Sequence, residues 1–438
     1  MAFSFKGGVH PPDMKELAKD SAITRLPAPD VVYIPLSQHI GAPAKPIVKK
    51  GDEVKMGQKI GEAGAFVSCH IHSSVSGKVK AIKDMLDPLG RYVPTVVIEN
   101  DGKDTPEYLE KHEDPLSLSK EDIKNISREA GLAGMGGATF PTFVKLSPPP
   151  EKKIDTFILN AAECEPYLTA DYRLMIEMPD EVIDGSLMFA KGYDTEKAWI
   201  GVEKNKPDAI AVLQEKASGK DISIGELKVK YPQGAEKQLI EAITGRQVPS
   251  GCLPFDAACA VQNVGTAVAL YEAAKLGKPL YERVVTVTGP LVKNPANILA
   301  RIGTPYRDLI EAAGGTTAEP GKVISGGPMM GLAQKSLDVP VTKGTSGILV
   351  FPGDMAVRDE EVACISCAKC VDICPVRLMP TMLAQNSRLQ RWEEAQKLGA
   401  LDCIECGSCQ YICPSHRRLL DRVRRAKAEI MAMQRKGK

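Results

Sequence analysis

Eight of the twelve cysteines in this 438-residue chain lie in two short blocks near its C-terminal end. Both blocks, CISCAKCVDICP from Cys364 and CIECGSCQYICP from Cys403, have the spacing C-x2-C-x2-C-x3-C-P. In bacterial ferredoxins with this spacing, three cysteines of one block and the fourth of the other hold each 4Fe–4S cluster. The predicted ligands are Cys364, Cys367, Cys370 and Cys413 for cluster 1, and Cys374, Cys403, Cys406 and Cys409 for cluster 2.

Two other uses of the cysteine blocks fit the sequence less well. A disulfide framework needs an oxidising compartment, which nothing else in the sequence indicates. Two zinc sites with four thiolates each are possible in principle. The repeated three-residue gap and the prolines that follow it, Pro375 and Pro414, favour iron–sulfur clusters. The spacer between the blocks has apolar residues at helical spacing from Met379 to Trp392, so we expect a helical two-cluster domain.

Composition places the rest of the chain among soluble globular proteins. Hydrophobic residues make up 43% and charged residues 25%, and the net charge is +1. These values give no indication of nucleic-acid binding. No apolar run reaches the roughly 18 residues that span a bilayer, and the stretch MAFSFKGGVHPP lacks the apolar core of a signal peptide. We therefore expect a cytoplasmic protein of several domains, which can still dock on a membrane-embedded partner.

Residues 42–82 alternate short β-prone runs with turn signals such as KKGDEV and SVSGKV. This phrasing resembles the barrel-sandwich (hammerhead) domain of biotinyl and lipoyl carriers. The tip where those domains carry the modified lysine reads CHIHSSVSG here, so we expect no swinging-arm attachment. His70 and His72 would share one face of a strand. We favour a surface face with two histidines, and keep a metal site as the alternative.

The stretch GLAGMGGATFP, from Gly131 to Pro141, is rich in glycine. A helix is predicted before it and no G-K-[ST] follows, so neither the Rossmann nor the P-loop motif applies. Glycines that admit a flat or anionic group, followed by a helix N-terminus, still suit phosphate binding. A plain loop between two helices is the alternative.

The segment from 154 to about 280 alternates strand and helix patterns, which predicts an α/β layer. A buried strand over Phe157–Leu159 is followed by Asn160, Glu163 and Glu165, and polar groups beyond a strand's carboxyl end are where open α/β sheets bind ligands. A further strand is expected over LKVKYP, residues 227–232. Residues 284–350 suggest a small α+β domain, whose GGPMMG segment we expect to be a turn that packs on a neighbour.

Four segments in the central region together resemble the flavoprotein subunit of respiratory complex I and related diaphorase subunits. They are Gly134–Thr142, Asn160–Pro166, Tyr231–Glu236 and Val261–Thr266, in the order of that family. The resemblance implies a non-covalent FMN that performs the chemistry, with no catalytic side chain, and NAD(H) as substrate. A flavin exchanges a two-electron hydride with NAD(H) and single electrons with clusters, which suits this task.

Carried over segment by segment, the resemblance implies two sets of ligands. The FMN set is Gly134, Gly136, Gly137, Lys145, Asn160, Glu163, Gly234, Asn263 and Thr266, and the NAD set is Phe140, Glu165 and Glu236. The chain departs from the family at Met135, Thr139, Ala162, Ala235 and around 250–253. Most of these departures concern the nucleotide side, which implies weaker NAD(H) binding.

The whole chain is similar to the RnfC family, whose members combine all of these parts. The resemblance implies a multidomain α/β and α+β fold. The implied domains are an N-terminal barrel-sandwich segment (1–110), an FMN/NAD-binding α/β domain (111–280), a β-grasp-like SLBB domain (281–352) and a helical two-cluster ferredoxin domain with a basic C-terminal helix (353–438).

The function implied by this resemblance is that of the NAD(H)-facing subunit of a membrane-bound, ion-translocating ferredoxin:NAD+ oxidoreductase. Its implied partners are membrane-embedded and ferredoxin-like Rnf subunits, with ferredoxin reached indirectly. The implied location is peripheral, on the cytoplasmic face of the bacterial cell membrane. Two alternatives stay open: a soluble diaphorase-type subunit of a hydrogenase or formate dehydrogenase, and a non-catalytic electron relay with an empty flavin pocket.

Overall fold

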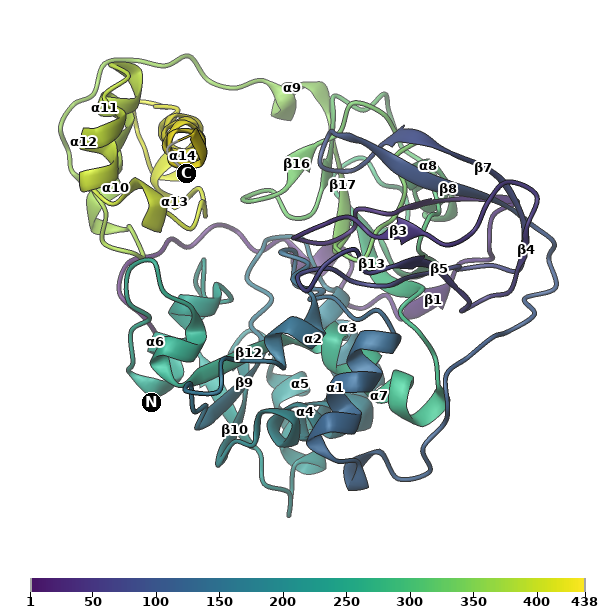
Figure 1. Ribbon diagram of the computed structural model, residues 1–438. Helices are drawn as coiled ribbons and strands as arrows, with labels where there is room; N and C mark the ends of the chain where they lie inside the picture. Colours follow the sequence, from purple (N-terminus) through teal and green to yellow (C-terminus); the bar gives the residue numbers. More distant parts are fainter. Residues whose placement is uncertain (1, 437–438) are drawn as a thin grey trace.

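The computed structural model describes residues 2–436, so Met1, Gly437 and Lys438 lie outside the described part of the chain. A barrel-sandwich domain, an α/β domain, an SLBB-type domain and a helical cluster domain follow one another along the sequence (Figure 1). The expected multidomain fold class is confirmed in this order. The α/β domain lies below the two β-rich domains, and the cluster domain stands apart at the upper left of the view.

The α/β domain is built on a parallel sheet of order β11-β10-β9-β12. Its central strand β9 has the pattern TFILNA and is almost wholly buried, as expected for a parallel strand covered on both faces. The strands are β9 (Thr156–Ala161), β10 (Lys197–Glu203), β11 (Ser223–Leu227) and β12 (Cys259–Asn263). The helices are α1 (Lys120–Glu129), α2 (Thr142–Lys145), α3 (Ala170–Glu177), α4 (Pro179–Tyr193), α5 (Pro207–Lys216), α6 (Glu236–Thr244) and α7 (Val264–Leu276).

The barrel-sandwich domain has two small antiparallel sheets, ordered β2-β8-β7-β4 and β3-β5-β6. Alternating burial along β2, with Val32 and Ile34 inward, produces its core. The strands are β2 (Val31–Pro35), β3 (Lys45–Pro46), β4 (Glu53–Val54), β5 (Lys59–Glu62), β6 (Ile71–His72), β7 (Gly77–Leu86) and β8 (Tyr92–Asn100).

The SLBB-type domain is a mixed sheet of order β1-β14-β13-β17-β15-β16. Its edge strand β1 (Ile23–Arg25) comes from the N-terminal segment and pairs in parallel with β14. The remaining elements are β13 (Glu282–Thr288), β14 (Ala296–Arg301), α8 (Tyr306–Ala312), β15 (Lys322–Ser325), β16 (Leu332–Ala333) and β17 (Gly347–Phe351). The N-terminal segment is therefore shared between domains.

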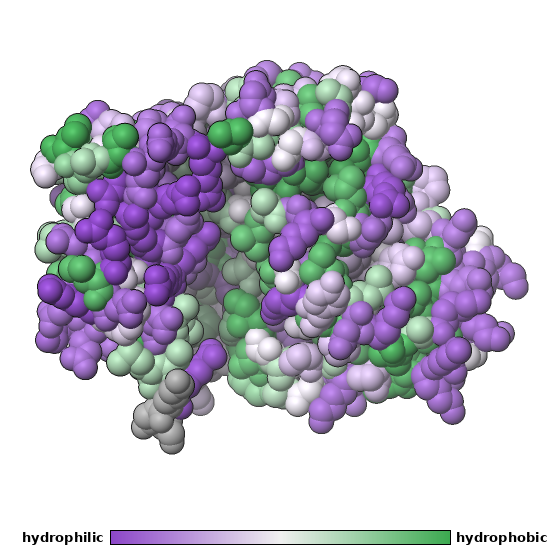
Figure 2. Space-filling view, turned by 90° about the horizontal axis from the view of Figure 1, so that it is seen from above, coloured by the Kyte–Doolittle hydropathy of each residue, from purple (hydrophilic) through white to green (hydrophobic). Residues whose placement is uncertain are grey.

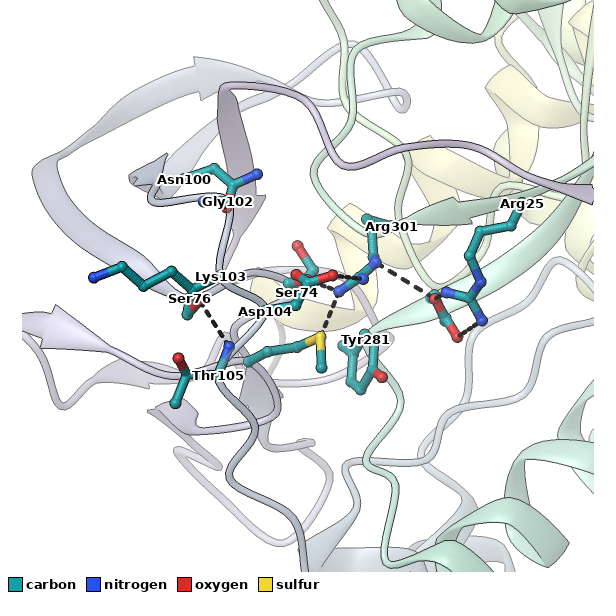
Figure 3. Close-up of polar contacts among 12 residues, drawn as sticks. Arg25, Ser74, Ser76, Asn100, Gly102, Lys103, Asp104, Thr105, Tyr281 and Arg301 are labelled. Carbon is teal, nitrogen blue, oxygen red and sulfur yellow. Dashed lines mark hydrogen bonds and ion pairs between the residues drawn. The ribbon is translucent and has the colours of Figure 1, made fainter.

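A buried arginine joins this sheet to the barrel-sandwich domain (Figure 3). The Arg301 guanidinium donates to the Ser74 carbonyl at 2.6 Å and to the Asp104 carboxylate at 2.7 Å. It also lies over the ring of Tyr281, 5.4 Å from the centroid. Charge-assisted bonds of this kind fix the geometry of two packed domains because the guanidinium donors form a rigid fork.

The cluster domain is helical, as predicted, and its long C-terminal helix packs on it. One face of α14 is buried: Leu419, Leu420, Val423, Ala426 and Ile430 are each at most 6% exposed. The helices are α9 (Gly353–Ala356), α10 (Lys369–Asp372), α11 (Pro380–Arg388), α12 (Trp392–Lys397), α13 (Ser408–Tyr411) and α14 (Leu419–Lys436). The basic tail is therefore first of all a structural part of this domain.

The first ten residues hold the cluster domain against the α/β domain. Phe3 pairs with the end of β11, and the Gly8 amide donates to the Ile373 carbonyl at 2.7 Å. A Cβ on Gly7 would lie 2.8 Å from the same Ile373 carbonyl, so only glycine permits this approach. Seen from above, a recess separates the cluster domain from the β-rich domains (Figure 2). Lower in the view of Figure 1, the cluster domain meets the α/β domain near α6.

Two sequence-based expectations are wrong in detail. His70 and His72 do not form a surface face, because each is only 2% exposed where β6 lies between its own domain and the glycine loop. The strand expected over 227–232 ends at Leu227. Its ladder ends there because the neighbouring strand β10 also stops at the paired residue, Glu203. Beyond it, the chain bonds to the N-terminal segment instead.

Candidate functional site

The order of the parallel sheet marks where a ligand would bind. Strands β9, β10 and β11 progress in one direction, whereas β12 returns to the other side of β9. A crevice forms beyond the carboxyl ends of the strands at such a switch point. The last residues paired between these two strands are Asn160 on β9 and Asn263 on β12. The sheet therefore brings together two side chains that are about a hundred positions apart in the sequence.

Hydrogen bonds fix the side chains of both asparagines. The Asn160 amide donates to the Gly234 carbonyl at 2.7 Å. The Asn263 carbonyl oxygen caps α7 by accepting from the Gly265 amide, and its Nδ2 donates to Asp171 at 2.6 Å. Gly234 leaves no room for a side chain, since a Cβ would lie 2.2 Å from the Ala162 carbonyl. These bonds fix the rim of the crevice.

The glycine loop closes the crevice from the helix α1 side. The Met135 amide donates to the Thr266 hydroxyl at 3.0 Å, and the Gly134 amide donates to the Phe140 carbonyl at 2.9 Å. The next two glycines, Gly136 and Gly137, are exposed. Within residues 2–436 their amides have no hydrogen-bond partner. Unpartnered amides beside a crevice are suited to an anionic or polar ligand.

These observations fit an FMN. Gly137 has φ of 104° and nothing within 4 Å of where a Cβ would be, so a flat group could approach the backbone there. Gly136 faces the Asn263 side chain, and a Cβ placed on this glycine would lie 3.4 Å from the Asn263 Cβ. Of the predicted FMN ligands, Glu163 is set back from the crevice, since it accepts from the Asp171 amide, 2.9 Å away, at the start of α3.

Two residues assigned to different ligands form one ion pair. Lys145, predicted for FMN, donates to Glu236, predicted for the nucleotide, at 2.7 Å, and also to the Val261 carbonyl at 3.0 Å. Both side chains are partly exposed. Because the lysine is held between the sheet and α6, the pair marks the outer edge of the crevice. Phe140, the third nucleotide candidate here, is partly buried next to Pro141.

Glu165, the remaining nucleotide candidate, is engaged by another domain. Its carboxylate accepts from the Met329 and Met330 amides, each at 3.0 Å. A Cβ on Gly327 would lie 2.2 Å from the same carboxylate. Burial raises the pKa of Glu165 to about 7, against the opposing effect of the two amide donors. The GGPMMG turn of the SLBB-type domain thus packs on a neighbour, as expected from the sequence.

The segment 250–253, where the chain departs from the flavoprotein family, contacts the cluster domain. The Ser250 hydroxyl bonds to the Asp402 carboxylate at 2.6 Å, and the Gly251 amide donates to it at 3.2 Å. Asp402 directly precedes Cys403. The residues that replace the family's nucleotide-side pair are therefore used here to anchor the cluster domain.

Asp171 belongs to this site but was not singled out from the sequence. It bonds to Asn263, as described above, and burial, reinforced by the charge of Glu163, raises its pKa to about 7. One feature of the sequence points to Asp171: it ends the segment after the buried strand that begins with Asn160 and carries the predicted polar ligands. What the sequence could not give is the proximity of α3 to the end of β12.

The four thiols predicted for cluster 2 line one hollow. Apolar side chains such as Leu378, Leu383 and Val423 surround this hollow. Its thiols are Cys374, Cys403, Cys406 and Cys409. Burial raises the pKa of Cys409, and its neighbours Cys406, Cys403 and Cys374 raise it further. Negative charge on these sulfurs therefore needs a positive centre among them, which fits an iron–sulfur cluster.

The thiols predicted for cluster 1 lie closer to solvent. Cys364 and Cys367 are exposed, whereas Cys370 and Cys413 are partly buried. Burial raises the pKa of Cys370, and the charges of Cys413 and Cys364 act in the same direction. The fourth cysteine of the second block thus lies near the first block, as crossed ligation requires.

The loop that carries Cys406, a thiol predicted for cluster 2, contacts the α/β and SLBB-type domains. The Tyr231 hydroxyl donates to the Cys406 carbonyl at 2.8 Å and lies 3.4 Å from Glu165. Gly407 packs against the Met329 carbonyl: a Cβ placed on this glycine would lie 3.1 Å from the carbonyl oxygen. One small contact region therefore joins the crevice, the GGPMMG turn and the cluster 2 loop.

Across residues 2–436, none of the helices combines the length and the apolar character needed to cross a bilayer.

Comparison with known protein families assigns each part of the chain. The barrel sandwich hybrid domain of RnfC matches residues 3–103, and the Nuo51 FMN-binding domain matches 127–272. An SLBB domain matches 284–333, and a 4Fe–4S dicluster domain matches 356–414. The chain therefore carries an FMN-binding domain and a domain for two 4Fe–4S clusters.

Among solved structures, an NAD+-reducing NiFe-hydrogenase in the H2-reduced state has a similar fold, with a TM-score of 0.54 and 19% identity. The match covers 72% of this chain and 64% of that chain. At this identity the similarity concerns the fold alone.

Relatives of known name match over nearly the full length. The C subunit of the Na(+)-translocating ferredoxin:NAD(+) oxidoreductase complex of Acetobacterium woodii is 50% identical, covering 99% of this chain and 98% of the relative. Its counterpart in the proton-translocating complex of Clostridium ljungdahlii is 48% identical, covering 99% and 95%. The C subunit of an ion-translocating oxidoreductase complex of Rhodobacter capsulatus is 39% identical, covering 91% and 78%. At this identity and coverage, the chain belongs to the RnfC family, the C subunits of ion-translocating ferredoxin:NAD(+) oxidoreductase complexes.

Proposed function

We propose that this chain is the NAD(H)-facing subunit of an Rnf-type ferredoxin:NAD+ oxidoreductase. Bound FMN would supply the conversion between two-electron exchange with NAD(H) and one-electron exchange with the clusters. The observation that carries the proposal is the contact between Tyr231, beside the flavin crevice, and the Cys406 carbonyl in the cluster 2 loop. This contact supports the proposal, because the proposed two-electron site and the proposed one-electron site would lie on either side of it.

The protein's own residues would bind and orient the ligands. We assign the free amides of Gly136 and Gly137 to the flavin, with Asn160 and Asn263 at the strand ends fixing its position. Gly134, Gly234 and Thr266 keep the rim in shape through the contacts described above. Lys145 and Glu236 at the outer edge, together with Phe140, would meet the nicotinamide nucleotide. Glu163 would act indirectly, by holding the start of α3.

The order of the clusters follows from their surroundings. The thiols proposed for cluster 2 lie in the loop that Tyr231 contacts, whereas two of the thiols proposed for cluster 1 are exposed. Electrons would therefore pass between flavin and cluster 2, then cluster 1, then a partner protein. We propose that this partner is a ferredoxin-like or membrane-embedded subunit of the complex, and that the chain is peripheral on the cytoplasmic face of the membrane. The boundaries near residues 110, 280 and 352 belong to the same proposal.

The test is the absorbance of the anaerobically purified chain, reconstituted with iron, sulfide and FMN, before and after NADH is added. We expect the flavin band to bleach and the broad iron–sulfur absorbance to fall. Retained FMN without any response to NADH would contradict the nucleotide assignment. Iron and sulfide without retained FMN would instead support the electron-relay alternative.

A matched pair of variants sharpens this test. Gly137→Ala would place a Cβ in the open space assigned to the flavin and would strain a backbone with φ of 104°. Gly51→Ala would impose similar strain, at φ of 98°, also with nothing within 4 Å, but in the barrel-sandwich domain. We expect only Gly137→Ala to lose FMN. Equal FMN content in the two variants would argue against the assigned crevice.

A further inference from the structure

Two buried cations of the SLBB-type domain lie directly behind the glycine loop. Arg283 on β13 is 4% exposed and Lys343, just before β17, is 1% exposed. Within residues 2–436 neither forms a direct ion pair with a carboxylate, and the carboxyl whose charge acts on Arg283 is that of the buried Asp171. Burying a charge without a direct ion-pair partner costs several kcal/mol. A structure that keeps two such cationic residues in contact, through the Lys343 carbonyl, needs a reason for them.

Lys343 holds the start of the loop. Its ammonium donates to the Gly131 carbonyl and the His70 carbonyl, each at 2.7 Å, and lies 3.6 Å from the Cys69 sulfur. All three of its protons therefore have an acceptor. The following residue, Gly344, packs so closely on the loop that a Cβ would lie 2.6 Å from Thr139.

Arg283 holds the middle of the loop. Its two terminal nitrogens lie 3.3 and 3.4 Å from the Met135 carbonyl, and it also donates to the Lys343 carbonyl. In a trans peptide the carbonyl of one residue and the amide of the next point in opposite directions. Turning the Met135 carbonyl toward Arg283 therefore turns the Gly136 amide away from it, toward the crevice. That amide is one of the two that have no partner in the described chain.

We propose that Arg283 and Lys343 are positioning residues of the flavin site, contributed by the SLBB-type domain. They orient the glycine-loop peptides so that the free amides face the ligand. Their positive charge, which is opposed on the Arg283 side only by the buried carboxyl of Asp171, favours the anionic phosphate and the more negative, reduced form of the ring. This inference rests on the proposed flavin site and assigns a role to a domain that the four matching flavoprotein segments do not include.

The test compares Arg283→Gln with Arg283→Lys and with Arg301→Gln in the full reconstituted chain. Arg301 is a matched control, because it is 6% exposed on the same sheet but bonds to the barrel-sandwich domain. The readouts are the FMN dissociation constant, from quenching of FMN fluorescence, the flavin midpoint potential, and the melting temperature. None of them depends on turnover.

We expect Arg283→Gln to weaken FMN binding about tenfold or more, and Arg301→Gln to lower the melting temperature without this loss. The flavin potential should fall by about 30 mV for each tenfold by which reduced FMN is weakened more than oxidised FMN. Arg283→Lys, which keeps the charge, should retain most of the potential while binding FMN less tightly. The corresponding variant Lys343→Met should also weaken FMN binding.

Three other outcomes would contradict the inference, and they differ in whether the proposed flavin site also fails. If Arg283→Gln binds FMN with wild-type affinity and potential, the cation is only structural and the inference fails while the proposed flavin site stands. If Arg301→Gln weakens FMN equally, the effect is general destabilisation and the inference again fails. If the wild-type chain itself binds no FMN, the proposed site fails and the inference fails with it.

Discussion

The two cysteine blocks have the same spacing, but the fold gives their clusters opposite surroundings. Of the thiols proposed for cluster 2, Cys374 and Cys406 are buried in an apolar hollow, whereas Cys364 and Cys367, proposed for cluster 1, are exposed. Solvent exposure is one of the factors that set the potential of such clusters. The difference teaches that equal motifs can be given unequal surroundings, as the proposed route requires: electron exchange inside the chain at cluster 2 and at the surface at cluster 1.

Removing one ligand from each cluster should give the largest contrast. Cys406→Ala deletes a ligand that also packs against Tyr231 and Val9, so we expect loss of cluster 2 and a large fall in melting temperature. Cys364→Ala should remove cluster 1 with a smaller fall, because this thiol is exposed. Iron and sulfide analysis should give about half the wild-type content in both variants. Equal falls in melting temperature would remove the distinction between the two sites.

Iron removal should separate the same sites in time. A chelator of ferrous iron reaches exposed ligands sooner than buried ones, so cluster 1 should be lost first and the iron–sulfur absorbance should decay in two phases. The fast phase should be missing in Cys364→Ala, which serves as the control. A single phase with all ligands present would mean that the clusters are equally accessible.

Glu165 provides a pH test on the cluster 2 side. Its pKa is raised from 4.5 to about 7, so between these values the folded state binds a proton that the unfolded state releases. The contribution of Glu165 to the free energy of unfolding is therefore largest below pH 4.5. It is lost as the pH rises through 7, and the loss is at most roughly 3 kcal/mol. We expect the melting temperature to fall from pH 5.5 to pH 8.

The variant Glu165→Gln should flatten this pH dependence. It should also loosen the GGPMMG turn, since one amide oxygen cannot replace two carboxylate oxygens as acceptors for Met329 and Met330. An unchanged slope would assign the titration to another group, such as Asp171, whose pKa is also raised to about 7. The ligands of cluster 1 should be unaffected in either case.

Tyr231→Phe should produce the smallest effect. It removes one hydrogen bond, to the Cys406 carbonyl, worth about 1 kcal/mol. Loss of a donor next to cluster 2 should shift its potential slightly to more negative values and leave cluster 1 unchanged, as followed by redox titration with EPR detection. Tyr411→Phe is the control, because that tyrosine is 48% exposed and lies in the second cysteine block. A shift of both clusters would contradict the assigned order.

Local patterns account for the parts of the fold that were predictable. The buried strand around Phe157, the helix before the glycine loop and the helix between the two cysteine blocks all follow from patterns within a few residues. The histidines of β6 were misplaced because their burial comes from a different domain, through Gly131 and Lys343. No pattern within the β6 segment carries that information.

The candidate site divides in the same way. The sequence by itself determined the repeated spacing of the two cysteine blocks, the glycine loop and the polar ends of β9 and β12, because these depend on spacing and on residue type. Only the tertiary structure decided that Asn160 meets Asn263, that Glu165 is bonded by the GGPMMG turn, and that Arg283 lies behind Met135. Such contacts join residues far apart in the chain, and they are fixed by how whole domains pack, which local propensity does not encode.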